Sequence, residues 1–264
     1  MEDTQQSFWD HLDELRRVIF RILGVALAFA VVAFIFRDEL FAVVLAPKED
    51  CFITYRLLSR LASVFSGSAA ESFDVPLINT GLAMQFVIHM KIAFAAGVVC
   101  ASPYIIYQLF RFVSPALYAD ERRYAVRVVG GGYLMFIIGM AVSYFLIFPL
   151  TFRFLGTYQV SSDVANLISL ESYVEVLVMM SVAMGIVFEM PVVAWLFARL
   201  GFLNDTFMRR YRRHAIVVIL IVAAVITPTS DIFTLLAVSL PMWLLYEGSI
   251  HLVARTHPVS RQPE

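Results

Sequence analysis

Cysteine and charge are both scarce in this chain of 264 residues. Only two residues are cysteine and only 16% are charged, with a formal net charge of −1. Two cysteines, Cys51 and Cys100, are too few for a disulfide scaffold, and we expect both to be free thiols. A net charge this close to zero gives no electrostatic reason to expect nucleic acid as a partner. It also excludes a disordered chain, which combines high net charge with low hydrophobicity.

The motifs that mark common enzyme classes are missing as well. The sequence contains no Gly-x-Ser-x-Gly elbow, no His-Glu-x-x-His pair, no Walker loop and no Gly-x-Gly-x-x-Gly turn. Its five histidines lack the spacing of paired metal ligands. The sequence therefore predicts no catalytic residue, no metal and no cofactor.

Apolar residues are abundant, at 60% of the chain. A soluble domain has roughly 45–50%, and a soluble globule with this excess would expose large apolar patches. The sequence therefore predicts an integral membrane protein surrounded by lipid. We expect an all-α fold, a polytopic membrane helix bundle that forms a single domain over residues 1–264.

Six apolar runs are candidates for membrane-spanning helices, because a span needs about 20 mainly apolar residues. They cover about 18–36, 86–110, 126–150, 173–200, 215–226 and 232–253. We expect the last two to be short, since the fifth run would rise only about 18 Å at about 1.5 Å per residue. The turn sequence at 227–231 leaves two alternatives open, two short spans or one re-entrant hairpin.

Basic residues indicate the orientation of these spans. Most of the 20 Lys and Arg residues flank one set of helix ends, so the positive-inside rule places both termini in the cytoplasm. Residues 1–17 are predicted to form a cytoplasmic interfacial helix that runs into the first span. Residues 38–85 are predicted to form an outer loop. Apolar residues recur at helical spacing from Leu57 to Phe65, which predicts an amphipathic helix within this loop.

Charged groups within spans are costly and usually functional. Glu189 lies deep in the fourth span, two residues before Pro191, which cannot donate a backbone hydrogen bond and predicts a kink. The Glu189 carboxyl could bond within the bundle or to another helix. Ser172 and Glu175 match a capping box, which predicts the start of the fourth helix. Near the N-terminus, a structural explanation is that Asp13 and Glu14 form ordinary intrahelical ion pairs with Arg17.

Several motifs follow one another in order along nearly the whole chain. They are His-Leu-Asp-Glu-Leu-Arg-Arg from His11, Ser-Pro-Tyr-Ile-Ile-Tyr-Gln from Ser102, Phe-Val-Ser-Pro-Ala-Leu-Tyr-Ala-Asp-Glu-Arg-Arg from Phe112, Phe-Pro-Leu from Phe148, Phe-Glu-Met-Pro from Phe188 and Thr-Pro from Thr227. With these motifs the chain resembles the TatC family, the multi-span receptor component of the twin-arginine protein translocase. The resemblance implies six spans with both ends cytoplasmic, in a bacterial-type inner membrane.

The resemblance also implies a function. Members of the family bind twin-arginine signal peptides of folded preproteins. They form an oligomeric complex with TatA-like and TatB-like single-span subunits, and the protonmotive force drives export. The implied signal-peptide site comprises Glu14, Leu15, Arg16, Phe112, Leu117, Glu121, Arg122 and Arg123. The implied polar contacts for a partner helix are Glu189 and Tyr144, and the implied outer-side positions are Pro47 and Asp231.

The chemistry of arginine supports two of these assignments. A guanidinium is always charged and pairs bidentately with a carboxylate, so two arginines need two acids near the membrane surface. Glu14 and Glu121 are the implied acids. The alternative function is a proton-coupled secondary transporter in which Glu189 and Lys91 relay protons.

Overall fold

A computed structural model describes residues 8–66, 75–113, 125–159, 161, 166–227 and 231–256. Nearly all of these residues are helical, and five stretches are long and apolar enough to cross a membrane. These stretches are Leu12–Ile35, Met84–Phe112, Val128–Thr157, Leu170–Arg199 and Ile232–Ala254. Four predicted site residues lie outside the described part of the chain, namely Leu117, Glu121, Arg122 and Arg123.

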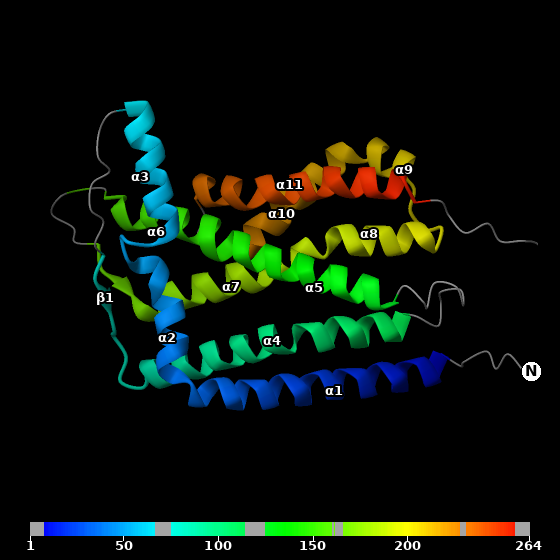
Figure 1. The fold of residues 1–264 in the computed structure, drawn as a ribbon, viewed down its shortest axis with the longest axis horizontal. Helices are drawn as coiled ribbons and strands as arrows, with labels where there is room; N and C mark the ends of the chain where they lie inside the picture. Colours follow the sequence, from blue (N-terminus) through cyan, green and yellow to red (C-terminus); the bar gives the residue numbers. More distant parts are fainter. Residues whose placement is uncertain are drawn as a thin grey trace, which may run out of the picture.

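The long helices form a bundle (Figure 1). Its main elements are α1 (Phe8–Ile35), α4 (Met84–Val113), α5 (Ala125–Val142), the π-helical turn η4 (Ser143–Ile147), α6 (Phe148–Thr157), α7 (Leu170–Phe188), α8 (Met190–Arg199), α9 (Asp205–Arg210), α10 (Arg212–Ile226) and α11 (Ile232–Ala254). The smaller elements are α2 (Arg37–Leu45), the 3-10 turn η1 (Ala46–Lys48), α3 (Ile53–Ser66), β1 (Leu77–Ile78) and β2 (Ile168–Ser169).

The two ends of the bundle differ. In Figure 1, the start of α1, the ends of α4 and α11, and α9 lie at one end, which we call the N-terminal end. Helices α2 and α3 and strand β1 lie at the opposite end, which we call the far end. There β1 pairs in parallel with β2, with Leu77 opposite Ile168. This two-residue pair is a small departure from the all-α prediction, and it ties the loop after α3 to the start of α7.

Helix α10 differs from the other apolar helices in length. It has 15 residues, or about 22 Å at about 1.5 Å per residue, which is less than the roughly 30 Å hydrocarbon core. Helix α11 has 23 residues and is long enough to cross. The prediction that both of the last two helices are short is therefore wrong for α11.

Small residues let helices approach closely at two places. A Cβ atom on Gly97 of α4 would lie 2.6 Å from the backbone nitrogen of Ala30 in α1. A Cβ atom on Gly139 of α5 would lie 2.6 Å from the carbonyl oxygen of Met184 in α7. Since lipid tails are as apolar as the side chains, close packing of this kind is a main source of helix association in membranes.

Side chains replace hydrogen bonds that prolines remove within these helices. Pro103 cannot donate to the carbonyl of Val99, and the Ser102 hydroxyl donates to that oxygen instead, at 2.6 Å. Pro149 likewise cannot donate to the carbonyl of Phe145, which instead accepts a hydrogen bond from the Thr54 hydroxyl of α3. The helices therefore continue past both prolines with their carbonyls satisfied.

The fourth apolar stretch is divided as Pro191 predicts. Helix α7 ends at Phe188 and α8 begins at Met190, so the predicted kink is confirmed. The predicted capping box of Ser172 and Glu175 is wrong. The α7 cap is Ser169, whose hydroxyl accepts a hydrogen bond from the Ser172 backbone N–H at 3.2 Å. Both Ser169 and Ser172 precede an apolar run. The β1–β2 pair ends at Ser169, so the helix begins directly after this earlier serine.

Candidate functional site

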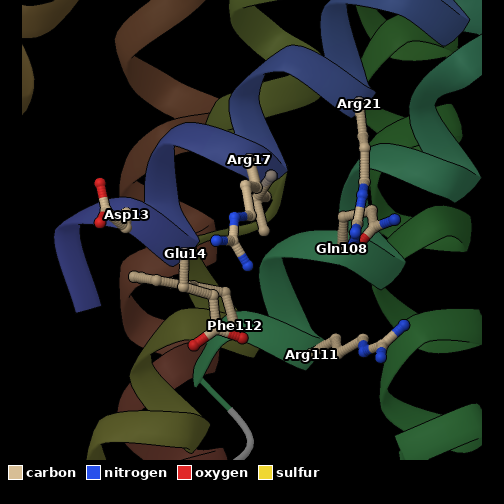
Figure 2. Close-up of a pocket in the computed structure, with 8 residues that line it drawn as sticks. Asp13, Glu14, Arg17, Arg21, Gln108, Arg111 and Phe112 are labelled. Carbon is tan, nitrogen blue, oxygen red and sulfur yellow. The ribbon is translucent and has the colours of Figure 1, made fainter. Parts of the chain in front are cut away.

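A polar cavity of about 380 Å³ lies between α1 and α4 at the N-terminal end of the bundle (Figure 2). We call it the α1–α4 cavity. Its lining residues are Asp13, Glu14, Arg17, Val18 and Arg21 from α1, and Gln108, Arg111 and Phe112 from α4. Most of these side chains are charged, although both helices are mainly apolar.

Helical periodicity explains how these residues come together. Glu14, Arg17 and Arg21 recur at intervals of three and four residues, which places them on one side of α1. Gln108 and Arg111 follow the same spacing on α4. The close contact at Gly97 holds the two helices together deeper in the bundle. The polar ends of both helices therefore face each other at the N-terminal end.

The α1–α4 cavity contains two carboxylates and three guanidinium groups. Glu14 is half-buried, and within the described part of the chain its carboxylate has no ion pair or hydrogen bond. The predicted intrahelical pairs of Arg17 with Asp13 or Glu14 are not formed. Figure 2 shows Glu14 extending toward Phe112, and Arg21 extending toward Gln108. A half-buried carboxylate with open acceptor positions can bind a cation through charge-assisted hydrogen bonds.

The structure brings together part of the predicted peptide site. Glu14 and Phe112 line the α1–α4 cavity. Arg16 is exposed beside it, in a neighbouring hollow of about 440 Å³, and its guanidinium carbon lies 5.7 Å from the centre of the Phe20 ring. Leu15 is half-buried and lines neither hollow.

Sequence reasoning missed six residues of the α1–α4 cavity. They are Asp13, Arg17, Val18, Arg21, Gln108 and Arg111. The four-residue spacing of Arg17 and Arg21 could have indicated that both lie on one side of α1. Arg111 and Gln108 could be assigned only with the knowledge that the end of α4 lies against the start of α1.

Glu189 lies at the break between α7 and α8, where three helices meet. Its Oε2 atom would be 3.0 Å from a Cβ atom placed on Gly132 of α5, a position that is also 3.3 Å from Ile106 Cγ2 of α4. Its Oε1 atom is buried and has no hydrogen-bond partner among the described residues. An unsatisfied buried oxygen in a membrane bundle is costly, so this carboxyl can accept or share a hydrogen bond with a polar group from another helix.

Lys91 does not contact Glu189. Its ammonium nitrogen lies 3.7 Å from Glu171 Oε1 and 3.9 Å from Glu175 Oε1 on α7. Glu189 follows Glu175 by fourteen residues, or about 21 Å along a helix at about 1.5 Å per residue. The two members of the postulated proton relay are therefore far apart.

Tyrosine hydroxyl groups organise the far end. Tyr144 donates to the carbonyl of Val43 at 2.6 Å, and Tyr173 donates to the carbonyl of Val44 at 2.9 Å. Tyr144 therefore holds α2, the helix that contains Val43. Its hydroxyl contacts α2 at the far end and is not beside Glu189.

Two implied outer-side residues also lie at the far end. Pro47 is buried in η1, and its carbonyl lies 3.1 Å from the hydroxyl of Tyr55, which also donates to the carbonyl of Pro149 at 3.0 Å. Burial raises the pKa of the Tyr55 hydroxyl, so it remains a donor across the physiological range. Asp231 caps α11 by accepting a hydrogen bond from the Thr234 backbone N–H at 2.7 Å. Among the described residues, no group of three or more His, Cys, Asp or Glu side chains is placed to hold a metal.

Comparisons with known proteins give a consistent result. The family model described as "Sec-independent protein translocase protein (TatC)" matches residues 10–241. TatC of Deinococcus radiodurans is 34% identical over 256 residues, which cover 95% of this chain and 87% of that protein. TatCy of Bacillus subtilis is 31% identical over 250 residues, which cover 95% of this chain and 89% of that protein. A crystal structure of the twin-arginine translocase receptor TatC superposes with a TM-score of 0.74 and 30% identity, covering 92% of this chain and 97% of that one.

Proposed function

Because the chain belongs to the TatC family of Sec-independent protein translocase proteins, we propose that it is the subunit that binds twin-arginine signal peptides. As a member of this family it is an integral membrane component of a transport machine, and the family is not one of enzymes. The α1–α4 cavity is the proposed site for the arginine pair. The observation that carries the proposal is the half-buried Glu14 carboxylate, which has no partner among the described residues.

The charges of the α1–α4 cavity suggest how it would select its ligand. One incoming guanidinium would pair bidentately with Glu14, and the second with Glu121, which follows the end of α4 in the sequence. Arg17 and Arg111 are themselves positively charged, so they would repel a cation that forms no direct pair with a carboxylate. Phe112 offers a ring face beside the pair. This combination favours a planar, forked cation over a simple positive charge.

The proposed orientation places the N-terminal end of the bundle in the cytoplasm of a bacterial-type cell. Helix α1 begins and helix α11 ends at this end of the bundle, and basic residues such as Arg209 and Arg213 lie in and just after α9. Helix α10 would be a sixth crossing in the inner membrane. Since it is only about 22 Å long, the bilayer must thin beside it or a partner must cover its end.

The proposed partners are TatA-like and TatB-like single-span subunits, and we expect the chain to act in an oligomeric complex. Glu189 is the proposed contact for a polar residue in a partner helix, because its Oε1 atom is buried without a partner among the described residues. The alternative of a proton-coupled transporter is disfavoured by the Lys91 contacts with Glu171 and Glu175.

A peptide-binding measurement tests the proposed function. We expect the purified protein to bind a fluorescent signal peptide with two consecutive arginines at least about tenfold more tightly than the same peptide with two lysines. Lysine keeps the charge but cannot form the bidentate pair, and tenfold corresponds to about 1.4 kcal/mol. Equal affinity for both peptides would contradict an arginine-specific site, and no binding of either would contradict the receptor function.

A second prediction concerns Glu189. Replacing Glu189 with Ala should reduce co-purification of the single-span subunits about tenfold, because one buried hydrogen bond to a carboxyl contributes about 1.5–3 kcal/mol. Binding of the twin-arginine peptide should not change, since Glu189 is not among the described residues that line the α1–α4 cavity. Glu189→Gln keeps hydrogen-bonding capacity and should retain most of the association. Equal loss of peptide binding and partner association in Glu189→Ala would indicate a folding role instead.

A further inference from the structure

An apolar groove of about 510 Å³ runs between α4 and α7, separate from the α1–α4 cavity. Its α4 wall includes Phe94 and Val98, and its α7 wall includes Met179 and Ile186. Phe94, Met179 and Ile186 are all exposed on the surface of the bundle. In a membrane, this groove therefore opens toward the hydrocarbon.

Charged groups close one end of the groove. Lys91 and Glu175 line it, and Glu171 lies beside them, also within ion-pair distance of Lys91. Lys91 lies two turns after the start of α4, Glu171 lies in the first turn of α7, and both helices start at the far end (Figure 1). The charged cluster therefore sits near the membrane boundary, with the apolar part of the groove running inward from it.

The three charged side chains are only loosely paired. Their N–O distances of 3.7 and 3.9 Å exceed the roughly 2.7–2.9 Å of a charge-assisted hydrogen bond. The side chains are 43% exposed for Lys91, 37% for Glu171 and 57% for Glu175. Each group can therefore accept a further partner, and the cluster carries one more negative than positive charge.

The length of the groove distinguishes between possible occupants. Along α7 it extends from Val174 to Ile186, or about 18 Å at about 1.5 Å per residue. One leaflet contributes about half of the roughly 30 Å hydrocarbon core. An acyl chain of a single leaflet matches this length, whereas a membrane-spanning partner helix would need a surface about twice as long.

We propose that this groove binds one phospholipid of the far-end leaflet with an ammonium headgroup. The phosphate pairs with Lys91, the ammonium donates to Glu171 and Glu175, and one acyl chain lies along Val98 and Met179. The excess negative charge of the cluster disfavours a headgroup that carries only a phosphate. A trimethylated headgroup has the same charge but no N–H donor, so the site discriminates against it as well.

Lipid retention tests the proposal directly. The full-length protein, depleted of lipid in detergent, is incubated with phosphatidylethanolamine, phosphatidylcholine or phosphatidylglycerol with identical acyl chains. Bound lipid is then counted by native mass spectrometry. We expect about tenfold greater retention of phosphatidylethanolamine than of either other lipid, as one or two charge-assisted hydrogen bonds allow. Equal retention of the three lipids would overturn the proposal.

Two variants locate the lipid. The double change Glu171→Gln and Glu175→Gln should abolish the preference for phosphatidylethanolamine. Ala95→Phe fills the groove and should remove the bound lipid, whereas the matched Val193→Phe adds a ring at an exposed position on α8 outside the groove. Thermal midpoints close to that of the wild type confirm that each variant is folded. Lipid retention by Ala95→Phe equal to that of Val193→Phe would place the lipid elsewhere and overturn the proposal.

Discussion

Replacing Glu14 with Gln is expected to weaken binding of a twin-arginine peptide about a hundredfold. Gln keeps the size of the side chain but removes the charge, and its amide presents a donor to the guanidinium in place of one acceptor. Loss of one bidentate charge-assisted pair costs about 3 kcal/mol, which corresponds to about two decades in Kd. In this variant, the described lining of the α1–α4 cavity would carry three arginines and a single carboxylate, that of Asp13, so the cavity would repel a cation. The measurement is a titration of labelled peptide followed by fluorescence anisotropy.

A matched substitution separates the effect of the site from a general effect of charge. Glu39→Gln makes the same change on α2 at the far end, where the side chain is exposed, and should leave peptide affinity unchanged. Both variants should accumulate in the membrane to the same level as the wild type. An unchanged Kd for a folded Glu14→Gln protein would mean that the arginine pair binds outside the α1–α4 cavity.

Replacing Gly139 with Leu is expected to destabilise the bundle strongly. A Cβ atom at this position would lie 2.6 Å from the Met184 carbonyl oxygen and 2.7 Å from Phe188 Cβ, well inside van der Waals contact. The obstacle is partly backbone, so the side chain cannot relieve it by changing rotamer, and α5 must move away from α7. We expect a destabilisation of about 3 kcal/mol or more, the upper range for overpacking. The readouts are the yield of monodisperse protein in detergent and its thermal midpoint.

Gly130 provides a control on the same helix. A Cβ atom there meets nothing within 4 Å, so Gly130→Leu should give normal yields and a similar thermal midpoint. Even Gly139→Ala should be less stable than Gly130→Ala. If the two leucine variants were equally stable, α5 and α7 could not be as closely packed as described.

Local features of the fold could be predicted from sequence, because they depend on short stretches of chain. Long apolar runs identify the membrane helices, and Pro191 identifies the break in the fourth one. The resemblance to the TatC family, which depends on several ordered motifs, is confirmed. The cap of α7 was predicted wrongly because Ser172 is followed three residues later by Glu175 and matches a capping box, whereas Ser169, the true N-cap, does not. Only the tertiary pairing of β2 shows where the helix begins.

Contacts between distant segments could not be predicted in the same way. Arg111 and Gln108 enter the α1–α4 cavity only because the close contact at Gly97 holds α1 against α4. Helix α4 contains no acidic residue, so the contact of Lys91 with Glu171 depends on the packing of α4 against α7. Eighteen residues, or five helical turns, separate Glu171 from Glu189, so helical periodicity alone would place both on one face. The two carboxylates instead have different neighbours, Lys91 for Glu171 and Gly132 with Ile106 for Glu189.

The hydroxyl groups at the far end have a mechanical consequence. Tyrosine and threonine side chains bridge the segment from α2 to α3 and the helices beneath it by binding backbone carbonyls on both sides. These carbonyls are those of Val43 and Val44 in the segment and those of Phe145 and Pro149 in the helices. Lifting the segment would leave several of these acceptors unsatisfied at the same time, at about 1–3 kcal/mol each where they are buried. We therefore expect the segment and the helix ends below it to move together, because separating them would break these hydrogen bonds at the same time.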